Sequence, residues 1–189
     1  MYIILIVLII LVLYYLFTKP KYKERLYYAQ MKHEDVEDIQ SIESRVYDHI
    51  DEIPRPSFVH ELIDKCPEFT MVARDERGDI IGAIYGGMMN GTHITMESLN
   101  NTHDPEGDTL TIYSACVRND LRGLGIGNRM FRYYYETWIS DQIQVKYISN
   151  VLRTRHIKWA EEMGFSYMGP SDIKIGNEPW FSVVKIINK

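Results

Sequence analysis

The distribution of apolar and polar residues predicts helices and strands in mixed order along most of the chain. Apolar residues recur every three to four positions over residues 34–47 and over residues 57–66, which predicts two amphipathic helices, the second ended by Pro67. Further helices are predicted from a glycine-rich loop to about Trp138 and over residues 154–163, ended by Gly164. Runs of β-branched and aromatic residues predict strands at residues 26–31, 69–74, 80–88, 109–117, 145–151, 165–175 and 180–187.

The order of these elements, β-α-α-β-β-β-α-β-α-β-β, sets the expected fold class. A short turn such as residues 75–79 joins antiparallel strands in a hairpin, whereas a strand–helix–strand crossover places two strands in parallel. Residues 90–107 are polar and rich in turn formers, so they are expected to form a loop with a short strand. We therefore expect an α/β (α+β) domain with one mixed sheet and flanking helices.

The beginning of the chain differs from the rest. Residues 2–17 contain no charge and no helix breaker, and Lys19, Lys21, Lys23 and Arg25 follow. A cleaved signal peptide would have a basic start and a small-residue cleavage site, which this stretch lacks. A buried segment of a globular domain would show a polar face. We therefore expect a transmembrane signal anchor at residues 1–18, a basic linker at residues 19–25 and a folded domain at residues 26–189.

The distribution of charge predicts on which side of the membrane the domain lies, and it excludes nucleic acid as a partner. The basic cluster after the apolar run predicts a single-pass membrane protein with its domain in the cytoplasm, by the positive-inside rule. The chain carries 21 Lys and Arg against 26 Asp and Glu, a net charge of −5. Because some of the basic residues lie in that cluster, the rest of the chain is more acidic than the net charge indicates. The domain itself is therefore acidic, so it repels nucleic acid and attracts cations such as protonated amines.

The two cysteines, Cys66 and Cys116, lie far apart and have no metal-binding spacing. Neither a disulfide framework nor a metal site is expected from them, which is typical of a reducing compartment. Cys116 has no evident base beside it in the sequence, and we expect it to be a small core residue and not a nucleophile.

A glycine-rich loop joins the predicted strand at residues 109–117 to the following helix, with the sequence Arg122-Gly123-Leu124-Gly125-Ile126-Gly127-Asn128. Such a junction directs free backbone N–H groups and the positive end of a helix dipole at one point, and glycine lets a diphosphate approach closely. The loop lacks the lysine of a P-loop and lies too late in the chain for a dinucleotide-binding fingerprint. It predicts diphosphate binding, with a purely structural turn as the alternative.

The pattern Arg122-x-x-Gly125-x-Gly127, between a strand and a helix, resembles motif A of the GNAT acetyltransferases. Residues 161–165, Glu-Glu-Met-Gly-Phe, resemble a later signature of that family. Other segments resemble, in the same order, its arylalkylamine (serotonin) N-acetyltransferase branch: Ile42-Glu43-Ser44, Cys66-Pro67-Glu68, residues 94–99 before His103, and residues 173–181. The resemblance covers about residues 35–186. It implies the GNAT fold, with a mixed, mostly antiparallel sheet and a central parallel splay.

The resemblance also implies acetyl-CoA as the cofactor, with no metal. Acetyl-CoA would lie in the splay, with its pantetheine along Ala115, Cys116 and Val117 and its diphosphate on the loop from Arg122 to Asn128. A backbone N–H near Cys116 or Val117 would polarise the thioester carbonyl. An amine would attack the thioester directly in a ternary complex, without an acyl-enzyme.

The acid and base positions of the serotonin branch are changed in this chain. Its two strand histidines correspond to Thr111 and Tyr113, and its helical tyrosine corresponds to Ala160. Because side chains alternate along a strand, Thr111 and Tyr113 are expected to share one face. Tyr113 is the best candidate for a proton path, with a packed aromatic residue as the alternative. His103 is a second candidate base, or else a solvated loop histidine.

The expected acceptor is a small primary amine. Acidic residues in the loops favour a substrate that carries a second cationic group, and an aromatic wall suits either an aryl ring or a cation. Polyamines or diamines are therefore placed ahead of arylalkylamines. Unless the acids are merely solvated, the expected substrate-binding residues are Tyr47, Asp51, Glu52, Pro54, Ile175, Glu178 and Trp180. Two alternatives stay open: an inactive acetyl-CoA sensor or scaffold, and a protein or histone lysine acetyltransferase. The sequence indicates no oligomeric state.

Overall fold

The computed structural model describes residues 22, 24–101 and 103–187. Within this part of the chain one sheet is formed by β1 (Tyr27–Ala29), β2 (Thr70–Arg74), β3 (Ile80–Met89), β4 (Thr109–Val117), β5 (Tyr147–Arg153), β6 (Ser166–Pro170) and β7 (Trp180–Ile186). The α-helices of the same residues are α2 (Val36–Val46), α3 (Pro56–Lys65), α4 (Ile126–Tyr133) and α5 (Thr154–Glu162). The helix α4 continues as a π-helical segment, Tyr134–Trp138.

The strands of this sheet lie in the order β1-β2-β3-β4-β5-β7-β6. Its neighbouring strands pair antiparallel, except that β4 and β5 are parallel. The helix α4 lies in the crossover between β4 and β5 that a parallel pair requires. The predicted order of elements, and the mixed, mostly antiparallel sheet with a central parallel pair, are therefore confirmed.

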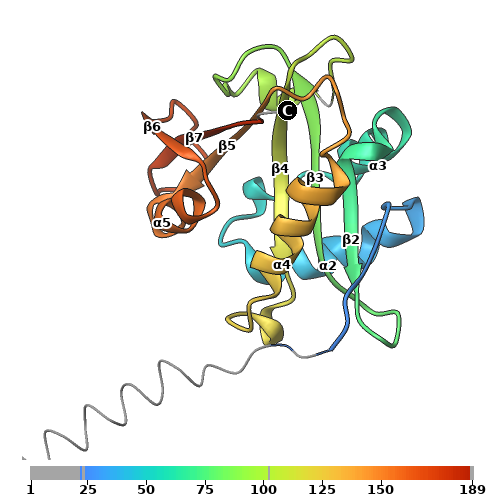
Figure 1. Cartoon of the computed structure of the whole chain (residues 1–189). Helices are drawn as coiled ribbons and strands as arrows, with labels where there is room; N and C mark the ends of the chain where they lie inside the picture. The colour runs from blue at the N-terminus through green and yellow to red at the C-terminus, as the bar shows by residue number, and fades with distance from the viewer. Residues whose placement is uncertain (1–21, 23, 102, 188–189) are drawn as a thin grey trace, which may run out of the picture.

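Helices cover both faces of the sheet. The helix α2 packs against β3 and β4 and passes behind them in Figure 1, whereas α4 crosses in front. Val36, Ile39 and Ile42 of α2 are buried, as their helical spacing predicts. The hydroxyl of Tyr134 donates to the carbonyl of Phe69 at 2.9 Å and ties the end of α4 to the segment before β2. The strands β5, β6 and β7 and the helix α5 form a second half, at the left of Figure 1.

Some predicted boundaries shift for local reasons. The strand predicted at residues 165–175 ends at Pro170, because the hydroxyl of Ser171 accepts the N–H of Ile173 at 3.2 Å and turns the backbone out of the ladder. The strand predicted at residues 145–151 continues to Arg153, which still pairs with Trp180. The short strand expected in residues 90–107 is not found among the described residues, which form a 3₁₀ turn at Ser98–Asn100.

The expected membrane-spanning protein requires a correction. The apolar run at residues 1–18 lies outside the described residues. In the part that is described, no helix has the length and apolar character needed to cross a bilayer. The helix α2, with 11 residues, reaches roughly 16 Å at about 1.5 Å per residue, against a hydrocarbon core of about 30 Å. This finding contradicts the expected single-pass localisation with a cytoplasmic domain.

Candidate active site

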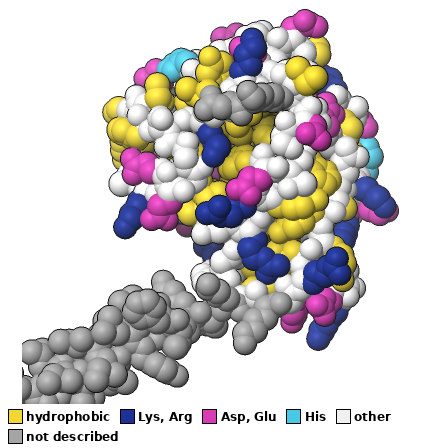
Figure 2. Space-filling view, in the orientation of Figure 1, with side chains coloured by type: hydrophobic (Ala, Val, Ile, Leu, Met, Phe, Trp, Pro, Cys, Tyr) yellow, Lys and Arg dark blue, Asp and Glu magenta, His cyan; other side chains and the backbone are white. Residues whose placement is uncertain are grey.

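The strands β4 and β5 separate part-way along their length. They pair only from Thr109, opposite Tyr147, to Thr111, opposite Ser149. Beyond that point β4 continues on one side and β5 on the other, and a cavity of about 330 Å³ lies in the opening. Figure 2 shows hydrophobic side chains in the hollow between the two halves of the molecule. The central parallel splay implied by the resemblance is therefore present.

A β-bulge in β4 shapes one wall of this cavity. Ser114 lies opposite Tyr85, but the next residue of β3 lies opposite Ile112, so Tyr113 is the extra residue of the bulge. A bulge interrupts the alternation of faces along a strand. Tyr113 and Ser114 both line the cavity, whereas Thr111 is buried outside its lining. Thr111 and Tyr113 were expected to share a face because side chains alternate along a regular strand. The bulge at Tyr113 interrupts this alternation, so that expectation no longer holds.

The glycine-rich loop lies directly before α4. Gly123 and Gly125 have φ angles of 77° and 82°, a left-handed conformation that glycine adopts without steric cost. The first helical hydrogen bond runs from the N–H of Arg129 to the carbonyl of Gly125 at 3.2 Å. The N–H groups of the three residues before Arg129 therefore have no acceptor within the helix. A diphosphate would find donors and the positive end of a helix dipole there.

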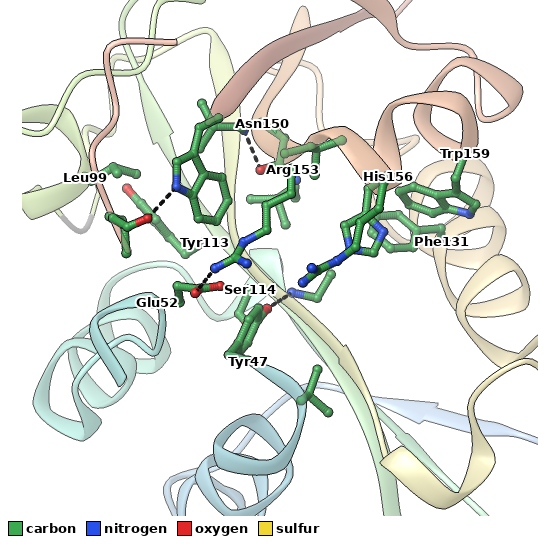
Figure 3. Close-up of a pocket in the computed structure, with 18 of the residues that line it drawn as sticks. Tyr47, Glu52, Leu99, Tyr113, Ser114, Phe131, Asn150, Arg153, His156 and Trp159 are labelled. Carbon is green, nitrogen blue, oxygen red and sulfur yellow. Dashed lines mark hydrogen bonds and ion pairs between the residues drawn. The ribbon is translucent and has the colours of Figure 1, made fainter. Parts of the chain in front are cut away.

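The side of the cavity next to α4 and α5 is aromatic and basic. The rings of Phe131 and Trp159 meet edge to face with centroids 4.5 Å apart, and the indole N–H of Trp159 donates to Asn128 Oδ1 at 2.7 Å. Figure 3 shows His156 beside these two rings, and Arg122 also lines the cavity. Burial, followed by nearby arginines, lowers the pKa of His156, so its imidazole is neutral at neutral pH.

The opposite side of the cavity lies between the α2–α3 loop and the segment before β7. Tyr47, Leu99, Ile175 and Trp180 line it. The indole N–H of Trp180 donates to the carbonyl of Ile175 at 2.8 Å, which holds this aromatic wall in place. Three of the residues expected to bind substrate, Tyr47, Ile175 and Trp180, therefore meet at one surface.

The other residues expected to bind substrate are distributed differently. Glu52 lines the cavity, whereas Asp51 and Pro54 line a neighbouring hollow of about 470 Å³. Glu178, in the loop before β7, contacts Arg153 at 2.7 Å. Glu52 and Glu178 are thus occupied by an arginine of the protein itself.

Arg153, at the end of β5, is the centre of an ion-pair cluster in which the pair with Glu52 is buried. Its side chain is 4% exposed and contacts Asp48 at 2.9 Å, Glu178 and Glu52. Arg155 pairs with Asp48 as well, at 2.8 Å. Figure 3 shows Arg153 reaching across the cavity toward Glu52. The cluster joins the α2–α3 loop to the β6–β7 loop across the end of β5.

The two candidate bases occupy different positions. His103 lies outside the cavity lining; its Nδ1 accepts the N–H of Met88 at 3.2 Å, and burial lowers the pKa of its imidazole. Tyr113 lines the cavity, and its hydroxyl donates to the carbonyl of Asn101 at 2.6 Å. Burial raises the pKa of Tyr113. The structure thus brings Tyr113, but not His103, to the cavity.

The two cysteines are free and buried. Burial raises the pKa of Cys66 to about 12 and also raises the pKa of Cys116. Neither thiol is therefore ionised at neutral pH. Only the ionised thiolate acts as a nucleophile or as a metal ligand. Within the described residues, no group of three or more His, Cys, Asp or Glu side chains is arranged to hold a metal ion.

A chain of hydrogen bonds leads from the cavity into the core. The hydroxyl oxygen of Tyr47 lies 2.9 Å from Ser114 Oγ and accepts the N–H of Ala115 at 3.3 Å. Ser114 donates to the carboxylate of Glu43, which also accepts the hydroxyl of Tyr85 at 2.6 Å. Glu43 is fully buried, and burial raises the pKa of its carboxyl group.

Sequence reasoning missed three residues of this site: Glu43, Arg153 and His156. Arg153 and Glu52 are 101 positions apart, and one sequence holds no signal that pairs them. Nothing distinguishes His156 from its neighbours in the predicted helix. Glu43 could have been found from the sequence, because it lies four residues after Ile39 on the apolar face of the predicted helix. A carboxylate at a core position requires a partner or a function.

Three solved structures illustrate the likeness to known proteins. The loading GNATL domain of CurA from Lyngbya majuscula has a TM-score of 0.74 at 14% identity, with 86% of this chain and 98% of that chain covered. Arabidopsis thaliana Naa50, in complex with the bisubstrate analogue CoA-Ac-MVNAL, has a TM-score of 0.63 at 17% identity, with 85% and 97% covered. A spermidine N-acetyltransferase chimera of Vibrio cholerae SpeG and hSSAT has a TM-score of 0.57 at 14% identity, with 85% and 95% covered. At these identities the likeness shows the fold alone.

The sequence itself identifies the family. The model of the acetyltransferase (GNAT) family matches residues 33–165, which include both strands of the splay and the glycine-rich loop. A comparison with curated protein sequences finds no significant match. The arylalkylamine branch is not confirmed by these findings and stays a resemblance. The chain belongs to the acetyltransferase (GNAT) family.

Proposed function

We propose that the protein transfers the acetyl group of acetyl-CoA to a small primary amine, with both substrates held in the cavity between β4 and β5. The observation that carries this proposal is the continuity of the cavity, which extends from Arg122 and His156 on one side to Tyr47 and Trp180 on the other. A donor beside the glycine-rich loop and an acceptor beside Tyr47 would meet there. Such placement removes much of the entropic barrier of a two-substrate reaction.

The residues before and at the start of α4 fit the diphosphate of acetyl-CoA. Arg122 lines the cavity and supplies a positive charge. Gly127 has open space where a side chain would stand, since a Cβ there would meet only Val117 Cγ2, at 3.9 Å. The N–H groups of Ile126, Gly127 and Asn128 precede the first helical hydrogen bond. These features support the predicted binding segment from Arg122 to Asn128, which includes Gly123, Leu124 and Gly125.

The open edge of β4 fits the pantetheine and the thioester. The N–H of Arg118 donates to Ile81 at 2.8 Å, toward β3. Because successive N–H groups point to opposite edges of a strand, those of Val117 and Ala115 point toward the splay. Tyr47 accepts the Ala115 N–H, so we assign Val117 the hydrogen bond to the acetyl donor.

Direct transfer from the thioester to the amine is favoured over an acyl-enzyme. Cys116 is the thiol on the strand beside the predicted acetyl position, and it is 2% exposed. Burial raises the pKa of its thiol, so it stays protonated and a poor nucleophile at neutral pH. The acceptor nitrogen would therefore form its bond to the acetyl carbon as the carbon–sulfur bond breaks and the thiolate of CoA leaves.

The cavity favours an amine with an apolar or aromatic body. The expected preference for polyamines rested on the carboxylates of Asp51, Glu52 and Glu178. The structure pairs Glu52 and Glu178 with Arg153 and places Asp51 outside the lining of the cavity, in that of the neighbouring hollow. The wall around Leu99, Ile175 and Trp180 is apolar and aromatic. The ion pairs of Arg153 also tie the loops on both sides of the acceptor end, which opposes passage of a polypeptide. We therefore place arylalkylamines ahead of polyamines and of protein lysines.

A substrate panel tests this proposal. The full-length protein is incubated with acetyl-CoA and, separately, tryptamine, phenethylamine, putrescine, spermidine or a histone-tail peptide, and release of the CoA thiol is measured. We expect kcat/KM to be at least about tenfold higher for the arylalkylamines than for spermidine, since one methylene-sized difference in apolar contact is worth about 1–3 kcal/mol.

Each other outcome selects a different function. Binding of acetyl-CoA without acetylation of any amine would select the sensor or scaffold. A higher kcat/KM for the peptide would select a protein acetyltransferase. Absence of acetyl-CoA binding would contradict the proposed function as a whole.

A further inference from the structure

A buried carboxylate is connected to the cavity by two hydroxyl groups. Glu43 lies on α2, within the core, and accepts hydrogen bonds from Ser114 of β4 and Tyr85 of β3. Gln40, one turn earlier on α2, donates to the other carboxylate oxygen at 2.9 Å. Ser114 in turn lies 2.9 Å from the hydroxyl oxygen of Tyr47, which lines the cavity. Ser114 and Tyr47 therefore connect Glu43 to the cavity by hydrogen bonds.

The direction of each hydrogen bond in this chain follows from the donors available. A serine hydroxyl has one hydrogen, and Ser114 donates it to Glu43. Tyr47 must therefore donate its own hydrogen to Ser114 Oγ. The hydroxyl oxygen of Tyr47 accepts the N–H of Ala115 at 3.3 Å, and it can accept one further hydrogen bond. All hydrogens in the chain are thus aligned toward the carboxylate.

We propose that Glu43 is the terminal proton acceptor for the acceptor amine, reached through Tyr47 and Ser114. This inference rests on the proposed function, because it assigns the path by which the substrate ammonium loses its proton. One N–H bond of the ammonium breaks and the proton passes to Tyr47 Oη. The hydrogen of Tyr47 passes to Ser114 Oγ, and the hydrogen of Ser114 passes to Glu43 Oε1. The products are a neutral amine and a neutral carboxylic acid, with both hydroxyl groups restored.

The surroundings of Glu43 suit a proton acceptor. The groups that face it are Tyr85 on β3, Ser114 and Cys116 on β4, Tyr47 after α2 and Gln40 on its own helix. Among the described residues Glu43 forms no ion pair, so no positive charge holds it ionised. Burial disfavours the charged form, whereas the hydrogen bonds from Ser114 and Tyr85 favour it. The balance makes Glu43 a stronger base than an exposed glutamate.

The first test is the pH dependence of kcat/KM in the full-length protein. Glu43→Gln keeps the shape of the side chain and removes its basicity. We expect kcat/KM near neutral pH to fall by about 10²- to 10⁴-fold, the usual contribution of a positioned acid or base. The difference in kcat/KM between Glu43→Gln and the wild type should become smaller as the pH rises toward the pKa of the amine, because more of the substrate is then already neutral. A deficit that is equal at all pH values would indicate a structural role and overturn the proposal.

Two further variants separate the relay from packing. Ser114→Ala interrupts the path but leaves Glu43 bound to Tyr85 and Gln40, and we expect it to reproduce the pH-dependent deficit. Ser44→Ala is the matched control, since Ser44 is exposed on α2 and bonds only to the carbonyl of Ser41 among the described residues; its profile should match the wild type. A wild-type profile for Ser114→Ala would overturn the relay.

The variant Tyr85→Phe tests the direction in which the pKa of Glu43 moves. The hydroxyl of Tyr85 favours the ionised carboxylate, so its removal raises the pKa of Glu43 further. Activity that depends on ionised Glu43 is lost as the pH falls through that pKa. We therefore expect the acidic limb of the kcat/KM profile to move to higher pH in Tyr85→Phe. A limb that stays in place, or moves to lower pH, would contradict the assignment.

A measurement without turnover distinguishes failure of the relay from failure of the proposed function. Infrared difference spectra between acidic and neutral pH should contain a carboxylic acid band that is absent in Glu43→Gln and displaced in Tyr85→Phe. If the wild type acetylates no amine, the proposed function fails, and this titration still shows whether Glu43 exchanges a proton. A Glu43 that stays protonated at neutral pH and above would overturn its role as acceptor.

Discussion

Replacing Arg153 with alanine is expected to lower the free energy of unfolding by about 3–5 kcal/mol, the usual cost of removing one partner of a buried ion pair. The side chains of Arg153 and Glu52 are only 4% and 3% exposed. Without the guanidinium, Glu52 would stay buried without its ion-pair partner, whereas Asp48 and Glu178 would still contact Arg155. Chemical denaturation of the full-length protein at neutral pH measures this change.

Arg155 supplies the matched control. It contacts two of the same carboxylates, Asp48 and Glu178, but its side chain is 50% exposed. Exposed ion pairs contribute only about 0–1 kcal/mol, so Arg155→Ala should change the free energy of unfolding by no more than that. The double variant Arg153→Met with Glu52→Gln should recover part of the loss, because no buried charge is left unpaired. Equal effects of Arg153→Ala and Arg155→Ala would contradict the burial of the pair between Arg153 and Glu52.

Gly127→Asp is expected to weaken acetyl-CoA binding by at least about a hundredfold while leaving the fold intact. Gly127 lies in the first turn of α4, where a Cβ would meet only Val117 Cγ2, at 3.9 Å. An aspartate in the first turn of a helix is favourable for the helix itself. Beside a bound diphosphate it would add a like charge, worth roughly 3 kcal/mol at about 5 Å and an effective dielectric constant of about 20. Isothermal titration with acetyl-CoA measures the change in Kd.

Gly127→Asn separates charge from size in this experiment. Asparagine has nearly the same volume as aspartate but no charge, so we expect it to weaken binding far less. The difference between the two variants should narrow at high salt, because screening reduces the repulsion. Thermal unfolding checks that both variants are folded. Wild-type affinity in Gly127→Asp would show that the diphosphate does not lie at the start of α4.

The sheet was predictable because its signals are local. The strand predicted at residues 109–117 coincides with β4, since β-branched and apolar residues predominate from the end of a polar loop to Arg118. The glycine-rich loop was likewise visible, because left-handed φ angles at Gly123 and Gly125 require that residue type. Both features depend only on neighbours in the sequence.

The parts of the site that depend on distant segments were not predictable. The bulge at Tyr113 arises from the register of β4 on β3, which the alternation within one strand does not reveal. The acidic loop looked like a binding surface for a cation until the structure placed Arg153 among its carboxylates. The position of Glu43 on an apolar helix face was readable, but its partners on β3 and β4 were not.

Acetyl transfer between two substrates bound together in the splay can be followed in a single turnover. The full-length protein is saturated with acetyl-CoA and mixed rapidly with tryptamine, and the release of the CoA thiol and the formation of N-acetyltryptamine are measured. Direct transfer predicts that thiol and product appear together, at one rate, and only when the amine is present. Release of thiol without amine, leaving an acetylated protein, would contradict direct transfer, and no release with any amine would contradict the enzyme itself.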